Sequence, residues 1–119
     1  MGEALTYAGA VLIFIWGVAH IIPARAVVDG FGPISTDNRR IITMEWVAEG
    51  LALCFIGLLV LISTIADAGA TAPVMSAVML LVMAAWTALT GARTSILPIK
   101  VCPFVKTGVA VLFLLGVAL

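Results

Sequence analysis

The sequence predicts an all-α fold, a polytopic membrane protein built as an antiparallel bundle of four transmembrane helices. Two features of composition point to it: 64% of the 119 residues are hydrophobic and only 10% are charged. Soluble domains carry about 45–50% apolar and about 25% charged residues. Because a small domain exposes much of its surface, this excess of apolar side chains must face lipid.

The third feature is the division of the chain into four apolar segments of spanning length, with residues 1–119 forming a single membrane domain. A membrane-spanning helix needs about 20 mainly apolar residues. The predicted helices cover residues 4–22, 41–66, 73–90 and 103–119.

Local signals mark where each segment begins and ends. The first helix stops before Pro23, and the third begins at Pro73, a residue favoured in the first turn, and ends before Gly91. The second is preceded by four residues that favour helix N-caps, Ser35-Thr-Asp-Asn38, and is long enough to span with tilt. The fourth, starting at Pro103, is short and just reaches across.

The connections between the segments differ in character. Residues 23–40 and 91–102 mix apolar side chains with Gly, Pro and basic residues, so we expect both to lie at the membrane interface. Residues 67–72 form a short turn without a basic residue.

The basic residues predict the orientation of the bundle. All six lie on, or within a turn of, the first and third connections: Arg25, Arg39, Arg40, Arg93, Lys100 and Lys106. By the positive-inside rule we expect a multi-pass protein of the cell membrane with these two connections in the cytoplasm and both termini outside. The zero net charge suggests no nucleic-acid partner.

Small residues mark the expected helix contacts, because membrane helices associate through close van der Waals approach. The candidates are Gly9, Gly17, Gly50, Gly57, Gly108 and Gly116.

Three residues whose placement in a bilayer costs free energy lie inside the predicted spans: His20, Glu45 and Glu49. A charge at bilayer depth is expensive, so such residues usually face the bundle interior and have partners. Glu45 and Glu49 are spaced i, i+4 and share one helix face. We expect His20 at the level of Glu45, with Trp16 and Glu49 one turn deeper.

A carboxylic acid beside a carboxylate or an imidazole is the minimum equipment for acid–base chemistry. Glu45, Glu49 and His20 are therefore the candidate catalytic residues, although they could also only pin helices together. The candidate substrate-binding residues are aromatic, hydroxyl-bearing or basic side chains at the same end of the bundle: Trp16, Trp46, Trp86, Thr90, Arg39, Arg40 and Arg93. The arginines could instead anchor the helices at lipid phosphate.

One His and a Glu-x-x-x-Glu pair supply too few ligands for a two-metal centre unless the protein dimerises, so we expect no metal and no cofactor.

The stretch from Gly9 to His20, followed by an interfacial segment ending in Phe31-Gly32, resembles the first helix and amphipathic loop of the DoxX-like four-helix membrane proteins. The resemblance covers the first third of the chain and implies the four-helix fold. It carries no residue role.

These observations favour an intramembrane enzyme that performs acid–base chemistry, such as isomerisation, cyclisation or epoxide opening, on a lipophilic small molecule in a pocket at the cytoplasmic half. The alternatives are a proton-coupled transporter of small molecules and a quinone-linked or accessory membrane subunit. The expected partners are the lipid bilayer and the lipophilic molecule, and a homodimer is left open.

Overall fold

The computed structural model describes all 119 residues and contains only helices. Four of them are long and apolar enough to cross a membrane: α1 (Gly2–Ile21), α3 (Thr36–Ile65), α4 (Thr71–Gly91) and α5 (Leu97–Ala118). A short helix, α2 (Ala24–Asp29), connects the first two. The predicted fold class, an all-α bundle of four transmembrane helices, is confirmed.

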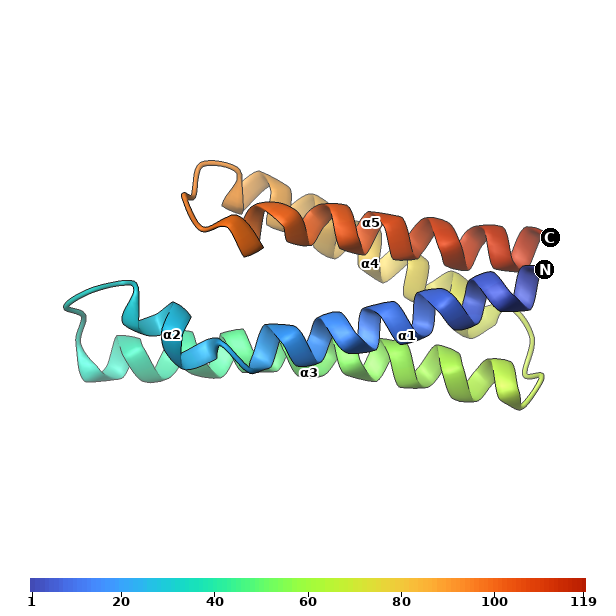
Figure 1. Ribbon diagram of the computed structural model, residues 1–119, viewed down its shortest axis with the longest axis horizontal. Helices are drawn as coiled ribbons and strands as arrows, with labels where there is room; N and C mark the ends of the chain where they lie inside the picture. Colours follow the sequence, from blue (N-terminus) through green and yellow to red (C-terminus); the bar gives the residue numbers. More distant parts are fainter.

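The four long helices form two antiparallel hairpins (Figure 1). One hairpin is α1 with α3, and the other is α4 with α5; α1 also packs along α5 and joins the two. Both termini lie beside the α3–α4 connection, which we call the terminal end. The opposite end, with residues 22–35 and 92–96, is the loop end, and there the two hairpins diverge (Figure 1).

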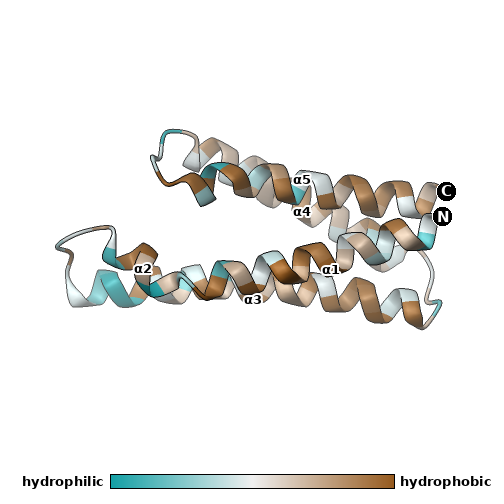
Figure 2. Ribbon diagram, viewed as in Figure 1, coloured by the Kyte–Doolittle hydropathy of each residue, from teal (hydrophilic) through white to brown (hydrophobic).

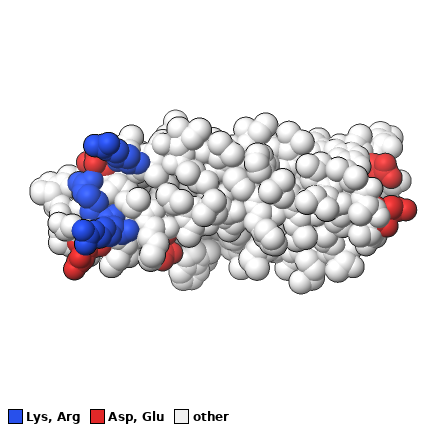
Figure 3. Space-filling view, turned by 90° about the horizontal axis from the view of Figure 1, so that it is seen from below, with Lys and Arg blue, Asp and Glu red and all other residues white.

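The apolar core lies between the helices and draws on all four spans. Its fully or almost fully buried members are Ala10, Ile13, Leu53, Ile56, Val60, Ala77, Leu80, Val109, Ala110 and Phe113. Hydrophilic residues concentrate at the loop end (Figure 2), and the Lys and Arg side chains visible in Figure 3 gather there too.

Close helix contacts occur at five of the six predicted glycines: Gly9, Gly17, Gly50, Gly57 and Gly116. A Cβ built on Gly17 would lie 2.7 Å from the carbonyl oxygen of Gly50, so α1 and α3 touch through their backbones at this point. The prediction is wrong for Gly108, whose missing Cβ faces open space.

All four spanning helices begin earlier than predicted, and for α3 and α5 the difference of five and six residues corrects the expected interfacial loops. α3 starts at Thr36, rather than Ile41, because the Ser35 hydroxyl accepts a hydrogen bond of 3.1 Å from the Asn38 N–H and caps the helix. α3 therefore has 30 residues, about 45 Å at 1.5 Å per residue, and its first turns extend beyond a hydrocarbon core of about 30 Å.

α5 starts at Leu97 rather than Pro103, with Pro98 in its first turn. The first-turn position suits proline, whose missing N–H would be unpaired there anyway. Pro103 lies inside the helix, where its ring removes one backbone hydrogen bond. Residues 91–102 are therefore mostly helical.

Candidate functional site

A buried lysine, Lys106, lies at the centre of a group of polar side chains inside the bundle. Lys106 lies nine residues after the start of α5, and its side chain is completely buried. Its ammonium group donates a hydrogen bond to Glu49 Oε1 and a second one, of 3.2 Å, to Thr87 Oγ1. A buried ammonium needs such partners, because leaving it unpaired in a low dielectric is costly.

Glu49 connects this lysine with the histidine of α1. One carboxylate oxygen accepts from Lys106, and the other lies 3.5 Å from His20 Nε2. The Glu49 side chain keeps about a third of its surface exposed. The cluster of His20, Glu49, Thr87 and Lys106, which we call the buried charge cluster, therefore takes one residue from each spanning helix.

His20 has a nitrogen without a hydrogen bond. Its side chain is 7% exposed, and Nε2 makes no hydrogen bond, since the distance to Glu49 is at the outer limit for one. The ring stacks on the indole of Trp46, with centroids 4.1 Å apart and planes 12° from parallel. Trp46 Nε1 also donates a 2.6 Å hydrogen bond to the His20 carbonyl oxygen. These contacts fix the imidazole while leaving one buried nitrogen unpaired.

A small cavity of about 230 Å³ adjoins this imidazole, and we call it the imidazole cavity. Its other walls are mainly apolar and aromatic: Trp16, Ala19, Pro23, Val27, Trp46 and Pro98. Trp16 is held by a 3.4 Å hydrogen bond from Nε1 to Cys102 Sγ on α5. His20 is the member that the cavity and the buried charge cluster share.

The predicted inward orientation of Glu45 is wrong. Its side chain is exposed on the outer surface, and Trp46 occupies the place beside His20. Each i, i+4 step turns a helix by about 40°. Since Trp46 and Gly50 face α1, that rotation carries Glu45 further from the interface than Glu49.

Two more predicted site residues lie outside the cluster. Trp86 is 69% exposed on α4, and Thr90 is exposed with its hydroxyl donating to the Trp86 carbonyl oxygen. The expectation that Trp86 lines the pocket with Trp16 is therefore wrong. Trp16 and Trp46 are brought together with His20, as described above.

The predicted arginines lie at the loop end, away from the buried charge cluster. Arg39 pairs with Asp29 at 2.5 Å, and Arg40 lies 4.0 Å from Asp37. Arg93 is exposed in the α4–α5 connection. The two α3 arginines therefore contact carboxylates of their own region.

Lys106 is the site residue that the sequence analysis missed, because a fourth helix beginning at Pro103 would leave it one turn from the interface. The helical spacing of the sequence around Lys106 did indicate that this residue is buried. Lys106 is spaced four residues after Cys102 and three before Val109, so it falls in the stripe of α5 that is buried in the bundle.

No three His, Cys, Asp or Glu side chains lie together as a metal-binding group. The chemistry offered by the site is that of an imidazole that lines a cavity and is backed by a carboxylate and an ammonium group.

Searches of protein-family models, curated proteins and solved structures find no match to this chain. The resemblance to the DoxX-like proteins stays a prediction.

Proposed function

We propose that this protein is an intramembrane enzyme performing acid–base chemistry on a lipophilic small molecule bound in the imidazole cavity. One observation carries the proposal: His20 has a buried, unpaired nitrogen, faces Glu49 and also lines the aromatic cavity. Buried polar atoms are almost always paired, so an unpaired one beside a cavity favours a functional role.

Isomerisation is the reaction type that this arrangement supports best. It needs a base that takes a proton from one substrate atom and an acid that returns a proton to another, without a co-substrate. His20 is the group in contact with the cavity, and Glu49 exchanges protons with it. Lys106 is a positioning residue because it binds Glu49, and Thr87 acts through Lys106, from which it accepts a hydrogen bond; neither lines this cavity.

The volume of the imidazole cavity limits how much of a substrate it can hold. Pockets for small ligands usually enclose about 300–1,000 Å³. At about 230 Å³, the imidazole cavity fits only the reacting part of a larger lipophilic molecule. The remainder would extend toward lipid, which suits an apolar chain.

Glu49→Gln should lower turnover at least 100-fold, because the amide keeps the shape of the side chain but cannot exchange a proton in this way. The purified protein in lipid nanodiscs is incubated in D₂O with lipophilic alkenes, enones and epoxides, and mass spectrometry follows deuterium uptake and product formation. Glu45→Gln is the matched control, since Glu45 is exposed and outside the cluster.

Melting temperatures are measured on the same variants, and activities are compared where each is folded. Wild-type activity in folded Glu49→Gln would refute the acid–base role. So would equal losses in Glu45→Gln and Glu49→Gln.

A second candidate, proton-coupled transport, is favoured by a different observation. The ion pair of Glu49 and Lys106 joins α3 of one hairpin to α5 of the other. A pair in that position could link proton binding to a movement of the hairpins. Uptake into proteoliposomes that requires a pH gradient, without chemical change of the solute, would favour this function over the enzyme.

We further propose that the protein lies in the cell membrane with its loop end in the cytoplasm. In a variant without Cys54 and Cys102, a cysteine at Ala70, at the exposed terminal end, should react with an impermeant maleimide on intact cells. A cysteine at Ser95, at the exposed loop end, should react only after permeabilisation. The reverse pattern would invert the orientation.

A further inference from the structure

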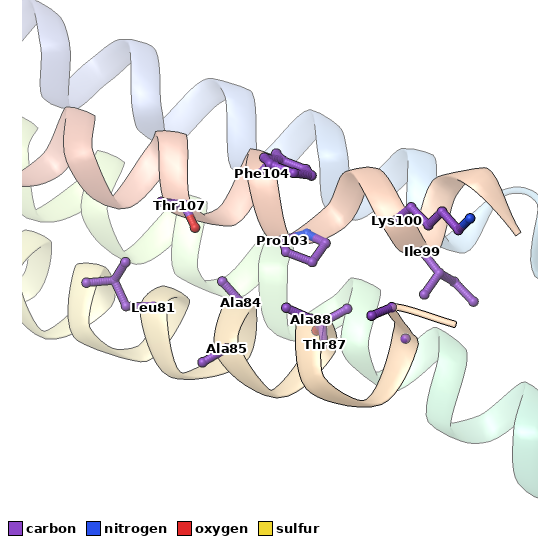
Figure 4. A pocket seen from close by; sticks show the side chains of 12 residues that line it. Leu81, Ala84, Ala85, Thr87, Ala88, Ile99, Lys100, Pro103, Phe104 and Thr107 are labelled. Atoms are coloured by element: carbon purple, nitrogen blue, oxygen red, sulfur yellow. The ribbon is translucent and has the colours of Figure 1, made fainter. Parts of the chain in front are cut away.

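A groove between α4 and α5 forms a second hollow, separate from the imidazole cavity. It encloses about 660 Å³ and is lined almost entirely by these two helices (Figure 4). Small residues of α4 create the space, among them Ala84, Ala88 and Gly91. On the α5 side the wall includes Pro103 and Phe104. The groove therefore presents an apolar surface shaped for a chain rather than for a polar solute.

A cation lies at one end of this groove. Lys100 and Leu81 are at opposite ends of it (Figure 4), and Lys100 belongs to the first turn of α5 at the loop end. Its side chain is exposed and has no carboxylate within 4.0 Å, and the same holds for Arg93 in the adjoining connection. Three of the other basic residues do pair with carboxylates, namely Arg39, Arg40 and Lys106. The groove thus ends beside two unpaired positive charges.

We propose that this groove binds one anionic phospholipid of the bilayer, with an acyl chain between α4 and α5 and the phosphate at Lys100 and Arg93. The arrangement of apolar and charged surfaces along the groove matches the acyl chain and headgroup of such a lipid. The apolar walls lie within the spans, and the cations lie at the loop end, where headgroups would be. Basic side chains at that level attract anionic headgroups, and charge-assisted hydrogen bonds to phosphate are strong.

Charge complementarity distinguishes this occupant from a second copy of the chain. A helix from another copy would cover Lys100 and leave its ammonium without a partner, which is costly away from water. The surface that such a copy would bring at this level carries more Lys and Arg than Asp and Glu side chains.

The groove also touches the buried charge cluster. Thr87 lines the groove, and its hydroxyl oxygen accepts the hydrogen bond from Lys106. An acyl chain in the groove would pack against the residue that helps hold Lys106. Lipid binding should therefore raise the melting temperature of the protein.

Native mass spectrometry of the purified protein with phosphatidylglycerol or phosphatidylcholine of identical chains tests the proposal. We expect phosphatidylglycerol adducts at concentrations at least tenfold lower than phosphatidylcholine adducts. The double variant Arg93→Ala with Lys100→Ala should abolish this preference. Arg40→Ala should retain it, because Arg40 is a loop-end cation away from the groove.

Filling the groove provides an independent test. Ala88→Leu and Ala85→Leu both add bulk to the groove from exposed positions, so either variant should fold. Both should weaken the binding of phosphatidylglycerol and remove its stabilising effect on the melting temperature. Val82→Leu, on α4 outside the groove, is the control and should bind like the wild type.

Equal binding of the two lipids by the wild type would overturn the assignment of the headgroup site. Unchanged binding in both groove-filling variants would overturn the assignment of the groove. A dimer that disappears in Ala88→Leu would show instead that this face contacts a second copy.

Discussion

Glu49→Leu should lower the free energy of unfolding by about 3–5 kcal/mol, because it leaves the ammonium of Lys106 buried without its charged partner. Lys106 is completely buried, and after this change only Thr87 would accept a hydrogen bond from it. The whole side chain of Lys106 is enclosed, so its ammonium group has no contact with water in this conformation. Unfolding in mixed micelles, followed by circular dichroism, measures the effect.

The double variant Glu49→Leu with Lys106→Met should recover most of this loss, since two apolar side chains of similar size replace both charges. The same double variant should be inactive in the deuterium-exchange assay. The combination separates stability from function: a cluster that only joins helices would be dispensable once it is replaced by apolar packing. Equal destabilisation in the single and double variants would show that Glu49 and Lys106 are not energetically coupled.

Composition and segment length were enough to predict the four spans, because the bilayer imposes its thickness on any helix that crosses it. The close contacts at Gly17 and Gly50 were also predictable. Membrane helices approach closely only where side chains are small, so glycine inside a span is informative by itself.

Only two of the four residues of the buried charge cluster could be identified from the sequence. His20 and Glu49 stood out because each is an ionisable residue within an otherwise apolar span. Lys106 did not, since its depth depends on where α5 begins, and a single turn of helix separates an interfacial anchor from a buried ammonium. Pro98 and Pro103 are both acceptable first-turn residues, and only the packed bundle decides between them.

The orientation of Glu45 could not be read from its spacing to Glu49. An i, i+4 pair is offset by about 40° around the helix axis, so one member can lie inside a helix–helix interface while the other lies outside it. Whether both residues lie inside it depends on where the partner helix sits. Here the contact of Gly17 with Gly50 sets that position.

Gly17→Leu should separate α1 from α3 and lower the free energy of unfolding by about 3 kcal/mol, at the upper end of the usual cost of overpacking. Even the first added carbon would lie 2.7 Å from the Gly50 carbonyl oxygen and 2.8 Å from the Cys54 backbone nitrogen. Backbone atoms cannot turn aside as a flexible side chain would, so the helices themselves must move.

Gly108→Ala is the matched comparison, because it is also a glycine inside a span but has nothing within 4 Å of the added carbon. Replacing a helical glycine by alanine without a clash stabilises by about 0.5–1 kcal/mol, so the two variants should shift stability in opposite directions. His20 lies one turn beyond Gly17 on α1, and moving α1 would widen the 3.5 Å separation of His20 from Glu49. Gly17→Leu should therefore also lose activity at temperatures where it remains folded, whereas Gly108→Ala should keep it. If Gly17→Leu unfolds like the wild type, the backbone contact between α1 and α3 does not exist, and the position of His20 would need another explanation.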